Sequence, residues 1–408
     1  MPWELPVGPA ALVRTDVLAL DEAALTDWVS SLGEKPFRGR QLFAWLHQRR
    51  ARSFDEMTDL SKDFRARMLE LAELRIPVVD EVKVAADGTR KYRLTTHDGH
   101  SIEAVWIPHA SGPQKHALCI SSQVGCAMGC AFCATAALKL TRHLGAGEIV
   151  GQVYAVLRDL EDHLPEDPPL PAGKVRYEPE LEPDAEPGAE PRAVDDDRPG
   201  KPRRRIQNIV YMGMGEPLHN VDNVIVSIRL LTSERGLCMS PRRITVSTSG
   251  LVSALERLGQ ETDVHLAVSL NATTDDVRQA IMPVTKRWGI AALLDACRAF
   301  PLERRRRITF EYVMLQNVND SDDDARRLVA LMAGMRCKVN LIPFNAHPLS
   351  PYARPADERV EAFRRILDDK HVSCFVRTTR GLDIDAACGM LGAQKLEKAR
   401  RELPVVPS

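Results

Sequence analysis

Apolar runs alternate with amphipathic helical patterns along most of the chain, from about residue 115 onward. Runs of β-branched and apolar residues predict six strands and one extra strand, over 117–121, 206–212, 243–248, 264–270, 308–314 and 338–344, with 373–378 as the extra one. Apolar residues at helical spacing predict helices between them, for example around 146–160, 222–233, 274–281, 322–333 and 357–369. This alternation indicates an α/β fold with a parallel sheet, either open or curled into a full or partial barrel.

The first part of the chain has a different pattern. Helical apolar spacing over 21–29 and 41–47 predicts a small helical unit between about 15 and 75. Two runs at 91–96 and 102–107, joined by a turn, predict a β-hairpin. The helical unit is basic and contains aromatic residues, so it could hold RNA phosphates, although a solvated basic face fits equally well. Its basic residues are Lys35, Arg38, Arg40, Arg49, Arg50 and Arg52.

A proline-rich segment over 164–205 interrupts the alternation. It contains ten of the 27 prolines, and its 11 acidic residues outnumber its 8 basic ones. Such a composition buries too little apolar surface to fold, so we predict a disordered acidic insertion. The predicted division of the chain is then an N-terminal helical domain, a hairpin extension, a core on either side of the insertion, and a C-terminal region, over 1–80, 81–114, 115–163 with 206–370, and 371–408.

Composition narrows the class of protein. The 408 residues are 44% hydrophobic and 27% charged, which excludes a collagen-like or wholly disordered chain, and the net charge of −1 neither requires nor excludes a nucleic-acid partner. The start of the chain lacks the pattern of a signal peptide. The uncharged run 116–138 contains Ser, Gln, Gly and four cysteines, so we predict no membrane span. Nine cysteines, an odd number, favour a reducing compartment over a disulfide scaffold.

Three of these cysteines carry the strongest chemical pattern. Cys126, Cys130 and Cys133 form a C-x3-C-x2-C triplet on a glycine-containing loop after a predicted strand. Structural zinc prefers four ligands, and no fourth Cys or His stands at a suitable spacing. Three thiolates on a [4Fe-4S] cluster would leave one iron open for a substrate or cofactor. A zinc knuckle with a distant fourth ligand is the alternative. Four other cysteines match no chemical pattern, namely Cys238, Cys297, Cys337 and Cys374.

Small polar residues gather where several predicted strands end. In parallel α/β barrels, the loops at the C-terminal ends of the strands share one mouth, so these residues would form a cradle for one polar cofactor. Serine and asparagine at such positions also serve as helix N-caps, which is the competing explanation for each. The strand ends read Gly213-Met-Gly215-Glu216-Pro217, Ser247-Thr248-Ser249-Gly250, Ser269-Leu270-Asn271 and Pro343-Phe344-Asn345.

The cysteine triplet resembles that of the radical S-adenosylmethionine (SAM) superfamily. The wider set of motifs strongly resembles the bacterial dual-specificity adenine-C2 methyltransferases of 23S rRNA and tRNA. The resemblance rests on the triplet, the Gly-Met-Gly-Glu-Pro, Ser-Thr-Ser-Gly, Glu311-Tyr-Val-Met-Leu and Asn340-Leu-Ile-Pro runs, and on the flanks of Cys119 and Cys388. It implies an α/β fold built as a partial (β/α)6 radical SAM barrel, with a small N-terminal helical domain and a β-hairpin extension.

The resemblance also implies a mechanism that uses two SAM molecules per turnover. One SAM would methylate Cys388; a second, on a [4Fe-4S] cluster held by the triplet, would yield a 5′-deoxyadenosyl radical that activates the S-methyl group for addition to adenine C2. Glu103 would then remove the C2 proton, and Cys119 would form a disulfide with Cys388 that releases the base. The SAM contacts it implies are Gly215, Glu216, Ser247, Ser269, Leu270, Asn271 and Asn345.

Two departures and two alternatives accompany this prediction. Asn271 stands where the family commonly has His, and the loop between Glu103 and Cys119 is longer than usual. An adenine-C8 rRNA methyltransferase of the same superfamily shares the triplet and both lone cysteines, and a non-catalytic zinc- or cluster-holding RNA-binding protein is the alternative of another class. For the C2 enzyme we expect a cytoplasmic monomer with 23S rRNA and tRNA as substrates, a flavodoxin-like electron donor and a thiol reductant. Further RNA contacts are predicted at 304–307 and 395–401.

Overall fold

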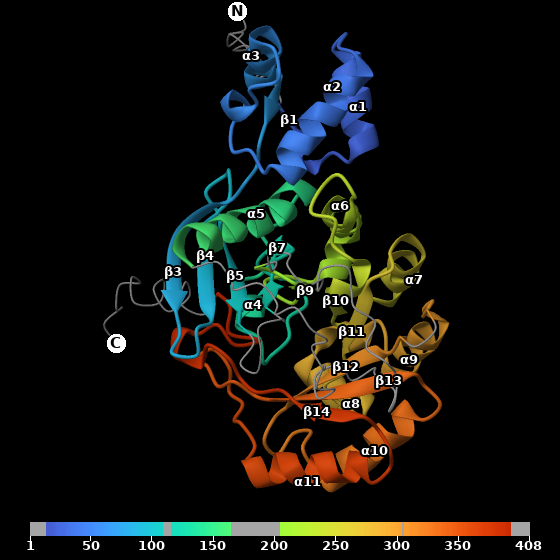
Figure 1. Cartoon of the computed structure of the whole chain (residues 1–408). Coiled ribbons are helices and arrows are strands. Elements are labelled where there is room, and N and C mark those ends of the chain that lie inside the picture. Colours follow the sequence, from blue (N-terminus) through green and yellow to red (C-terminus); the bar gives the residue numbers. More distant parts are fainter. Residues whose placement is uncertain (1–13, 109–115, 165–204, 304–305, 393–408) are drawn as a thin grey trace, which may run out of the picture.

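One ten-stranded sheet forms the centre of the computed structural model, which describes residues 14–108, 116–164, 205–303 and 306–392 (Figure 1). The strand order is β14-β13-β12-β11-β10-β9-β6-β5-β4-β3, so the sheet is open, with β14 and β3 at its two edges. Seven neighbouring strands run parallel: β6 (Ala117–Cys119), β9 (Asn208–Tyr211), β10 (Ile244–Thr248), β11 (His265–Ser269), β12 (Ile308–Met314), β13 (Cys337–Pro343) and β14 (Cys374–Val376).

These seven strands coincide with the seven predicted from the sequence, and the predicted α/β fold class is confirmed. Helices connect the parallel strands, and several pairs of them pack against each other: α5 with α6, α6 with α7, α7 with α9, and α10 with α11. Their bounds are α5 (Ala146–His163), α6 (Val221–Thr232), α7 (Val252–Glu261), α8 (Asp275–Ile281), α9 (Ile290–Ala299), α10 (Asp322–Met332) and α11 (Asp357–Asp368).

The sequence of each central strand explains its place in the sheet. In β12, Ile308, Phe310, Tyr312 and Met314 are buried and alternate with partly exposed residues, as the two-residue period of a strand requires. Parallel strands joined by helices end at a common edge. The loops that follow β9, β10, β11 and β13 therefore meet at one mouth, where the predicted cofactor residues stand.

An antiparallel extension continues the sheet beyond β6. It contains the predicted hairpin of β4 (Arg90–Thr95) and β5 (Ser101–Ile107), together with β3 (Val78–Val84), a strand that the sequence analysis did not predict. The register pairs Lys91 with Val105 and Val105 with Cys119, so these three residues lie in one row across β4, β5 and β6. The hairpin thereby extends the face of the sheet that carries Cys119.

The N-terminal helical unit packs along α5, from Gly147 near its start to Glu161 near its end (Figure 1). It comprises α1 (Glu22–Ser31), α2 (Pro36–Phe43), which continues as a π-helical turn over Ala44–Gln48, and α3 (Lys62–Leu71). The side chains of Asp21 and Ser61 cap α1 and α3 by accepting from the N–H groups of Ala24 and Phe64. His47 Nδ1 lies 2.8 Å from the Tyr154 hydroxyl of α5, which joins the unit to the core.

Some predicted features lie outside the described residues: nearly all of the acidic insertion, Arg304 and Arg305 of the basic run at 304–307, and the basic stretch at 395–401. Within that basic run, Arg306 is buried and bonds the Asp263 carbonyl and Glu303. Arg306 is therefore directed inward rather than toward a partner. No helix within the described ranges combines the length and the apolar character needed to cross a bilayer.

Candidate active site

The cysteine triplet lies on a loop between β7 (Gln123–Val124) and α4 (Ala134–Ala137). Two backbone contacts hold this loop: Cys126 N–H donates to the Lys139 carbonyl at 3.2 Å, and Ala131 N–H donates to the Ile281 carbonyl of α8 at 2.9 Å. At its start, Gly125 has φ +77°, and a Cβ added there would lie 1.6 Å from the Lys139 carbonyl oxygen. Only glycine fits this position, so the sequence Gly125-Cys126 is required by the path of the loop.

The thiols of the triplet lie close enough together to influence one another's ionisation. Burial raises the pKa of Cys126 to about 12 and that of Cys130 well above its usual value, and the neighbouring cysteines raise both further. Burial also raises the pKa of Cys133. Thiolates so placed need a positive centre among them.

Glu216 lies in the loop after β9 and hydrogen-bonds residues of that loop, of the loop after β10 and of β7. Its Oε2 accepts from Ser249 N–H at 2.7 Å, and its Oε1 accepts from Leu218 N–H at 3.0 Å. Its own N–H donates to Gln123 Oε1 at 2.8 Å, directly after Gly215. Burial raises the pKa of this carboxyl, and the backbone donors oppose that effect. The carboxyl group is thus fixed beside the cluster loop, with lone pairs left for a cationic ligand group.

A second carboxylate, that of the partly exposed Glu311 on β12, stands among the predicted SAM contacts. Ser247 Oγ donates to Glu311 Oε2 at 2.9 Å, and Leu270 N–H donates to the Glu311 carbonyl at 3.0 Å, next to Ser269. Burial raises the pKa of Glu311, although the Ser247 hydroxyl and Arg377 lower it. The sequence analysis quoted Glu311 only as part of a motif and assigned it no role.

The side chain of Asn271 makes its contacts inside the protein. It is fully buried; its Oδ1 accepts from Val313 N–H at 2.7 Å, and its Nδ2 lies 3.2 Å from Met282 Sδ. Its φ is +57°, a left-handed conformation in which Asn and His are both enriched. This explains how Asn can replace the His common at this position. It also means that a SAM contact at Asn271 would fall to its backbone rather than to its side chain.

Arg278 of α8 is a buried cation that the sequence analysis missed. The residue is 0% exposed, and its guanidinium donates to the carbonyls of Ser249, Ser269 and Leu270 and to the hydroxyl of Thr285. It therefore joins the ends of β10 and β11. Burial lowers its pKa to about 10, and the nearby Cys130 opposes that shift, so the positive charge faces the cluster loop. No short local motif marks such a residue, because its acceptors are backbone carbonyls.

The segment that carries Cys388 is tied to the cluster loop. Ala134 N–H donates to the Gly389 carbonyl at 2.8 Å, and Thr135 Oγ1 donates to the Leu391 carbonyl at 2.8 Å, both directly after Cys133. On the opposite side, Asn345 Nδ2 donates to the Cys388 carbonyl at 3.3 Å. Cys388 itself is exposed, but the surrounding protein raises the pKa of its thiol, first through loss of water and next through Glu311.

Cys119 and Glu103 approach the same region from the sheet. Cys119 is buried at the end of β6, and burial together with the negative potential of Cys388 raises the pKa of its thiol. Glu103 of β5 is also buried, and its Oε2 accepts from Gly392 N–H at 2.9 Å, four residues after Cys388. The structure thus brings the cluster loop, the strand ends, Cys119, Glu103 and Cys388 to one mouth.

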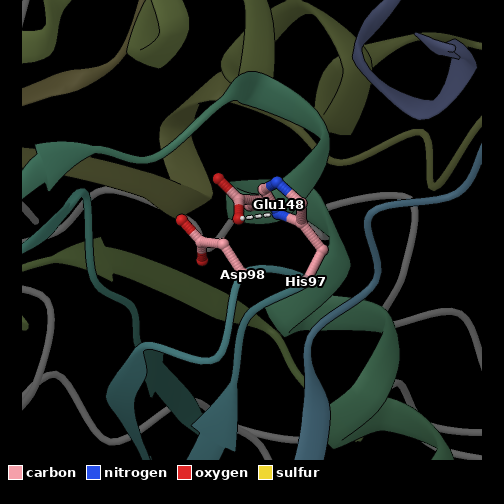
Figure 2. Close-up of side chains that lie close together, drawn as sticks. All are labelled: His97, Asp98 and Glu148. Atoms are coloured by element: carbon pink, nitrogen blue, oxygen red, sulfur yellow. Dashed lines mark hydrogen bonds and ion pairs between the residues drawn. The ribbon is translucent and has the colours of Figure 1, made fainter. Parts of the chain in front are cut away.

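Another group of potential metal ligands lies outside this mouth. His97, Asp98 and Glu148 lie together where the β4–β5 turn meets the start of α5 (Figure 2). Arg142 already supplies positive charge there: it pairs with Asp98 at 2.6 Å and with the buried Glu148 at 2.7 Å. The Arg142 guanidinium holds the pKa of Asp98 below its usual range. We interpret this group as an ion-pair network that fixes the strand following the cluster loop.

Comparison with known proteins agrees with this geometry. The chain is 46% identical to dual-specificity RNA methyltransferase RlmN 2 of Myxococcus xanthus, over 94% of this chain and 92% of that protein. It is 44% identical to dual-specificity RNA methyltransferase RlmN of Pelobacter propionicus, over 95% and 98% of the two chains. This chain belongs to the RlmN family. A crystal structure of a radical SAM methyltransferase from Sphaerobacter thermophilus superposes with a TM-score of 0.79 at 38% identity, over 93% of this chain and all of that one.

RlmN membership confirms the resemblance inferred from the motifs, and the chain is an RNA methyltransferase of the radical SAM class. The ribosomal RNA large subunit methyltransferase N-terminal domain matches residues 15–74, the basic helical unit. In that unit the Arg49 guanidinium stacks on Trp45, 4.1 Å from the ring centroid, and Phe37 is 40% exposed. Lys35, Arg40 and Arg52 are exposed, whereas Arg50 pairs with Glu161 of α5 at 2.8 Å.

Proposed function

We propose that this RlmN-family enzyme methylates C2 of adenine in 23S rRNA and in tRNA, with Cys388 carrying the methyl group between SAM and the base. The observation that carries the proposal is the position of the Cys388 segment. Gly389 and Leu391 bond the first residues after the cluster loop, and Gly392 bonds Glu103. One short segment therefore links the proposed carrier, the proposed cluster site and the proposed base.

The donor set suits a [4Fe-4S] cluster and SAM. Cys126, Cys130 and Cys133 would hold three irons, and Glu216 would accept a hydrogen bond from the SAM amino group beside the fourth. Ser247 and Ser269, with backbone groups of Gly215, Leu270 and Asn271, would line the rest of the ligand. When bound, the cluster would supply the electron that cleaves one SAM to methionine and a 5′-deoxyadenosyl radical, which takes a hydrogen atom from the S-methyl group.

The first half of the reaction loads Cys388. Its sulfur attacks the methyl group of one SAM, so an S–C bond forms, the SAM sulfonium bond breaks, and the thiol proton leaves. Because Cys388 is an exposed residue at this mouth, SAM and later RNA can approach it from the same side. Asn345 would hold this segment through the Cys388 carbonyl, and Thr379 in turn donates to Asn345 Oδ1 at 3.0 Å.

The second half places the methyl carbon on adenine. Adenine C2 has no lone pair with which to attack a methyl cation donor. We therefore propose that the methyl carbon attached to the Cys388 sulfur becomes a radical and adds to C2. Glu103 would then accept the C2 proton, and the unpaired electron of the adduct would return to the oxidised cluster. The Cys119 thiolate would attack the Cys388 sulfur, so that an S–S bond forms and the S–CH2 bond breaks, and the released carbon would take up a proton to give the methylated base and leave a disulfide. The target adenine must leave its stack to reach this mouth.

Other parts of the chain would serve the substrate and the redox cycle. The exposed basic residues and Trp45 of the N-terminal unit would contact RNA phosphates and bases. A flavodoxin-like donor would reduce the cluster, and a thiol reductant would open the Cys119–Cys388 disulfide after each turnover, which suits the cytoplasm. We propose that the enzyme works as a monomer.

Mass analysis of rRNA and tRNA nucleosides from a strain that lacks this gene tests the proposed function. Loss of 2-methyladenosine from both RNA pools, restored by the gene, is the expected result. Loss of 8-methyladenosine instead would assign the chain to adenine-C8 chemistry. Unchanged nucleosides, together with colourless protein that contains stoichiometric zinc after anaerobic purification, would favour the non-catalytic alternative.

A further inference from the structure

Lys91 on β4 is a buried lysine beside the proposed base. Its side chain is 4% exposed, and lysine is almost never so buried unless it is paired. Nζ lies 3.1 Å from Glu103 Oε2 and donates to the Asp385 carbonyl at 3.1 Å. Removing a buried ammonium from water is costly, so these two contacts explain why the side chain stays where it is.

The contacts of Lys91 connect two parts of the chain that lie 294 residues apart. Glu103 belongs to the hairpin, whereas Asp385 precedes Cys388 in the C-terminal segment. Glu103 Oε2 also accepts from Gly392 N–H, on the far side of Cys388. The lysine and the carboxylate together therefore hold the Cys388 segment at one point before the cysteine and at another point after it.

The β3–β4 turn strengthens this attachment. Asp87 Oδ2 accepts from Gly381 N–H at 3.1 Å, and Asp383 Oδ2 accepts from Ala86 N–H at 3.0 Å. The antiparallel extension is therefore attached to the C-terminal segment at several points. Lys91 is the attachment point next to the proposed base.

The geometry also separates the two oxygens of Glu103. Both fixed contacts, from Lys91 and from Gly392, fall on Oε2, and no described residue bonds Oε1. A hydrogen bond and an ion pair on one oxygen hold the carboxylate in place and leave the other oxygen to accept a proton. The register adds that Lys91 shares a row with Cys119, through Val105, on the same face of the sheet.

We propose that Lys91 is a positioning residue for the second half of the reaction: it aligns Glu103 with the Cys388 segment so that the C2 proton is removed from the RNA adduct on Cys388. This inference rests on the proposed function. The two polar contacts of Lys91 are with Glu103 and with the Asp385 carbonyl, and neither involves a proposed cluster or SAM residue, so we expect methylation of Cys388 to proceed without it. Its loss leaves the adduct unresolved.

The test compares Lys91→Met with Glu103→Gln, Cys119→Ala and a matched control, Lys83→Met. Lys83 is the register partner of Lys91 on β3, but its side chain is 35% exposed. Each protein is first incubated with SAM alone, and mass spectrometry gives the S-methyl occupancy of Cys388. Reductant and RNA are then added, and a denaturing gel gives the fraction of protein bound covalently to RNA.

Lys91→Met is expected to keep the wild-type occupancy of Cys388, to accumulate adduct at least tenfold over wild type, and to lose methylated RNA by a similar factor. Lys83→Met is expected to match wild type. Wild-type adduct and product levels in Lys91→Met would overturn the inference. If Glu103→Gln accumulates no adduct while Cys119→Ala does, the assignment of the base fails instead. Should Lys91→Met fail to fold, Lys91→Gln, which can still donate to the Asp385 carbonyl, is held to the same criteria.

Discussion

Two glycines of the cluster loop can be replaced separately by alanine, and the two variants differ mainly in the space available to the new Cβ. Gly125 and Gly129 stand in the same loop, and both have left-handed φ angles, +77° and +69°. An alanine at either position carries strain of about 1–2 kcal/mol from that conformation alone. The surroundings differ. A Cβ at Gly129 would meet its nearest neighbour, Pro283 Cγ, at 3.5 Å, which is an ordinary contact, whereas at Gly125 it would overlap a carbonyl oxygen.

The magnitude at Gly125 follows from that overlap. To bring the Lys139 oxygen from 1.6 Å to a carbon–oxygen contact of roughly 3.3 Å, the two segments must separate by about 1.7 Å. The separation breaks the Cys126 N–H to Lys139 carbonyl bond, which contributes about 1 kcal/mol. Strain and lost bond together reach about 2–3 kcal/mol. More important, Cys126 moves away from the other two thiols.

Iron content per chain after anaerobic reconstitution, with the absorbance near 400 nm, measures the consequence. Gly129→Ala is expected to bind iron like wild type and to unfold at a slightly lower urea concentration. Gly125→Ala is expected to retain less than about a third of the wild-type iron. Full iron binding by Gly125→Ala, or equal losses in both variants, would refute the view that the path of this loop sets the positions of the thiols.

Three further predictions follow from other parts of the site and its support. Cys388→Ala should stop methyl transfer to RNA, and Cys119→Ala should trap a covalent protein–RNA adduct on a denaturing gel; turnover by Cys388→Ala would exclude the proposed carrier. Burial lowers the pKa of His47 from 6.5 to about 3, so the unfolded chain binds more protons below pH 6.5; folding stability should fall by roughly 2 kcal/mol from pH 6.5 to 5 in urea titrations. His47→Gln should reduce that fall, while the exposed His163→Gln should not. Arg142→Gln leaves Glu148 buried without its main partner and should lower the free energy of unfolding by about 3–5 kcal/mol, whereas Arg298→Gln, in an exposed pair, should change it little.

The sequence predicted those features whose determinants are local. The seven parallel strands are short runs of apolar and β-branched residues, and the cysteine triplet can be identified from its spacing alone. β3 was missed because its sequence, Val-Val-Asp-Glu-Val-Lys-Val, places charged residues among the valines. In the structure this strand lies at an edge of the sheet, with Val78 and Val84 exposed.

The features that could not be predicted depend on partners distant in sequence. Lys91 acquires its role only because the fold brings Asp385 to it, and Arg278 because the ends of β10 and β11 offer their carbonyls. For Asn271, the family resemblance implied a SAM contact without naming the atoms that make it. The structure shows its side chain in contact with Val313 and Met282.

Transfer of the methyl carbon through Cys388 is the central claim, and isotope labelling tests it most directly. Enzyme carrying a trideuterated S-methyl group on Cys388 is given RNA and unlabelled SAM for a single turnover. We predict that the methyl group of the product adenine contains two deuterium atoms and that 5′-deoxyadenosine gains the third. A product methyl group without deuterium, with the label still on Cys388, would contradict the account.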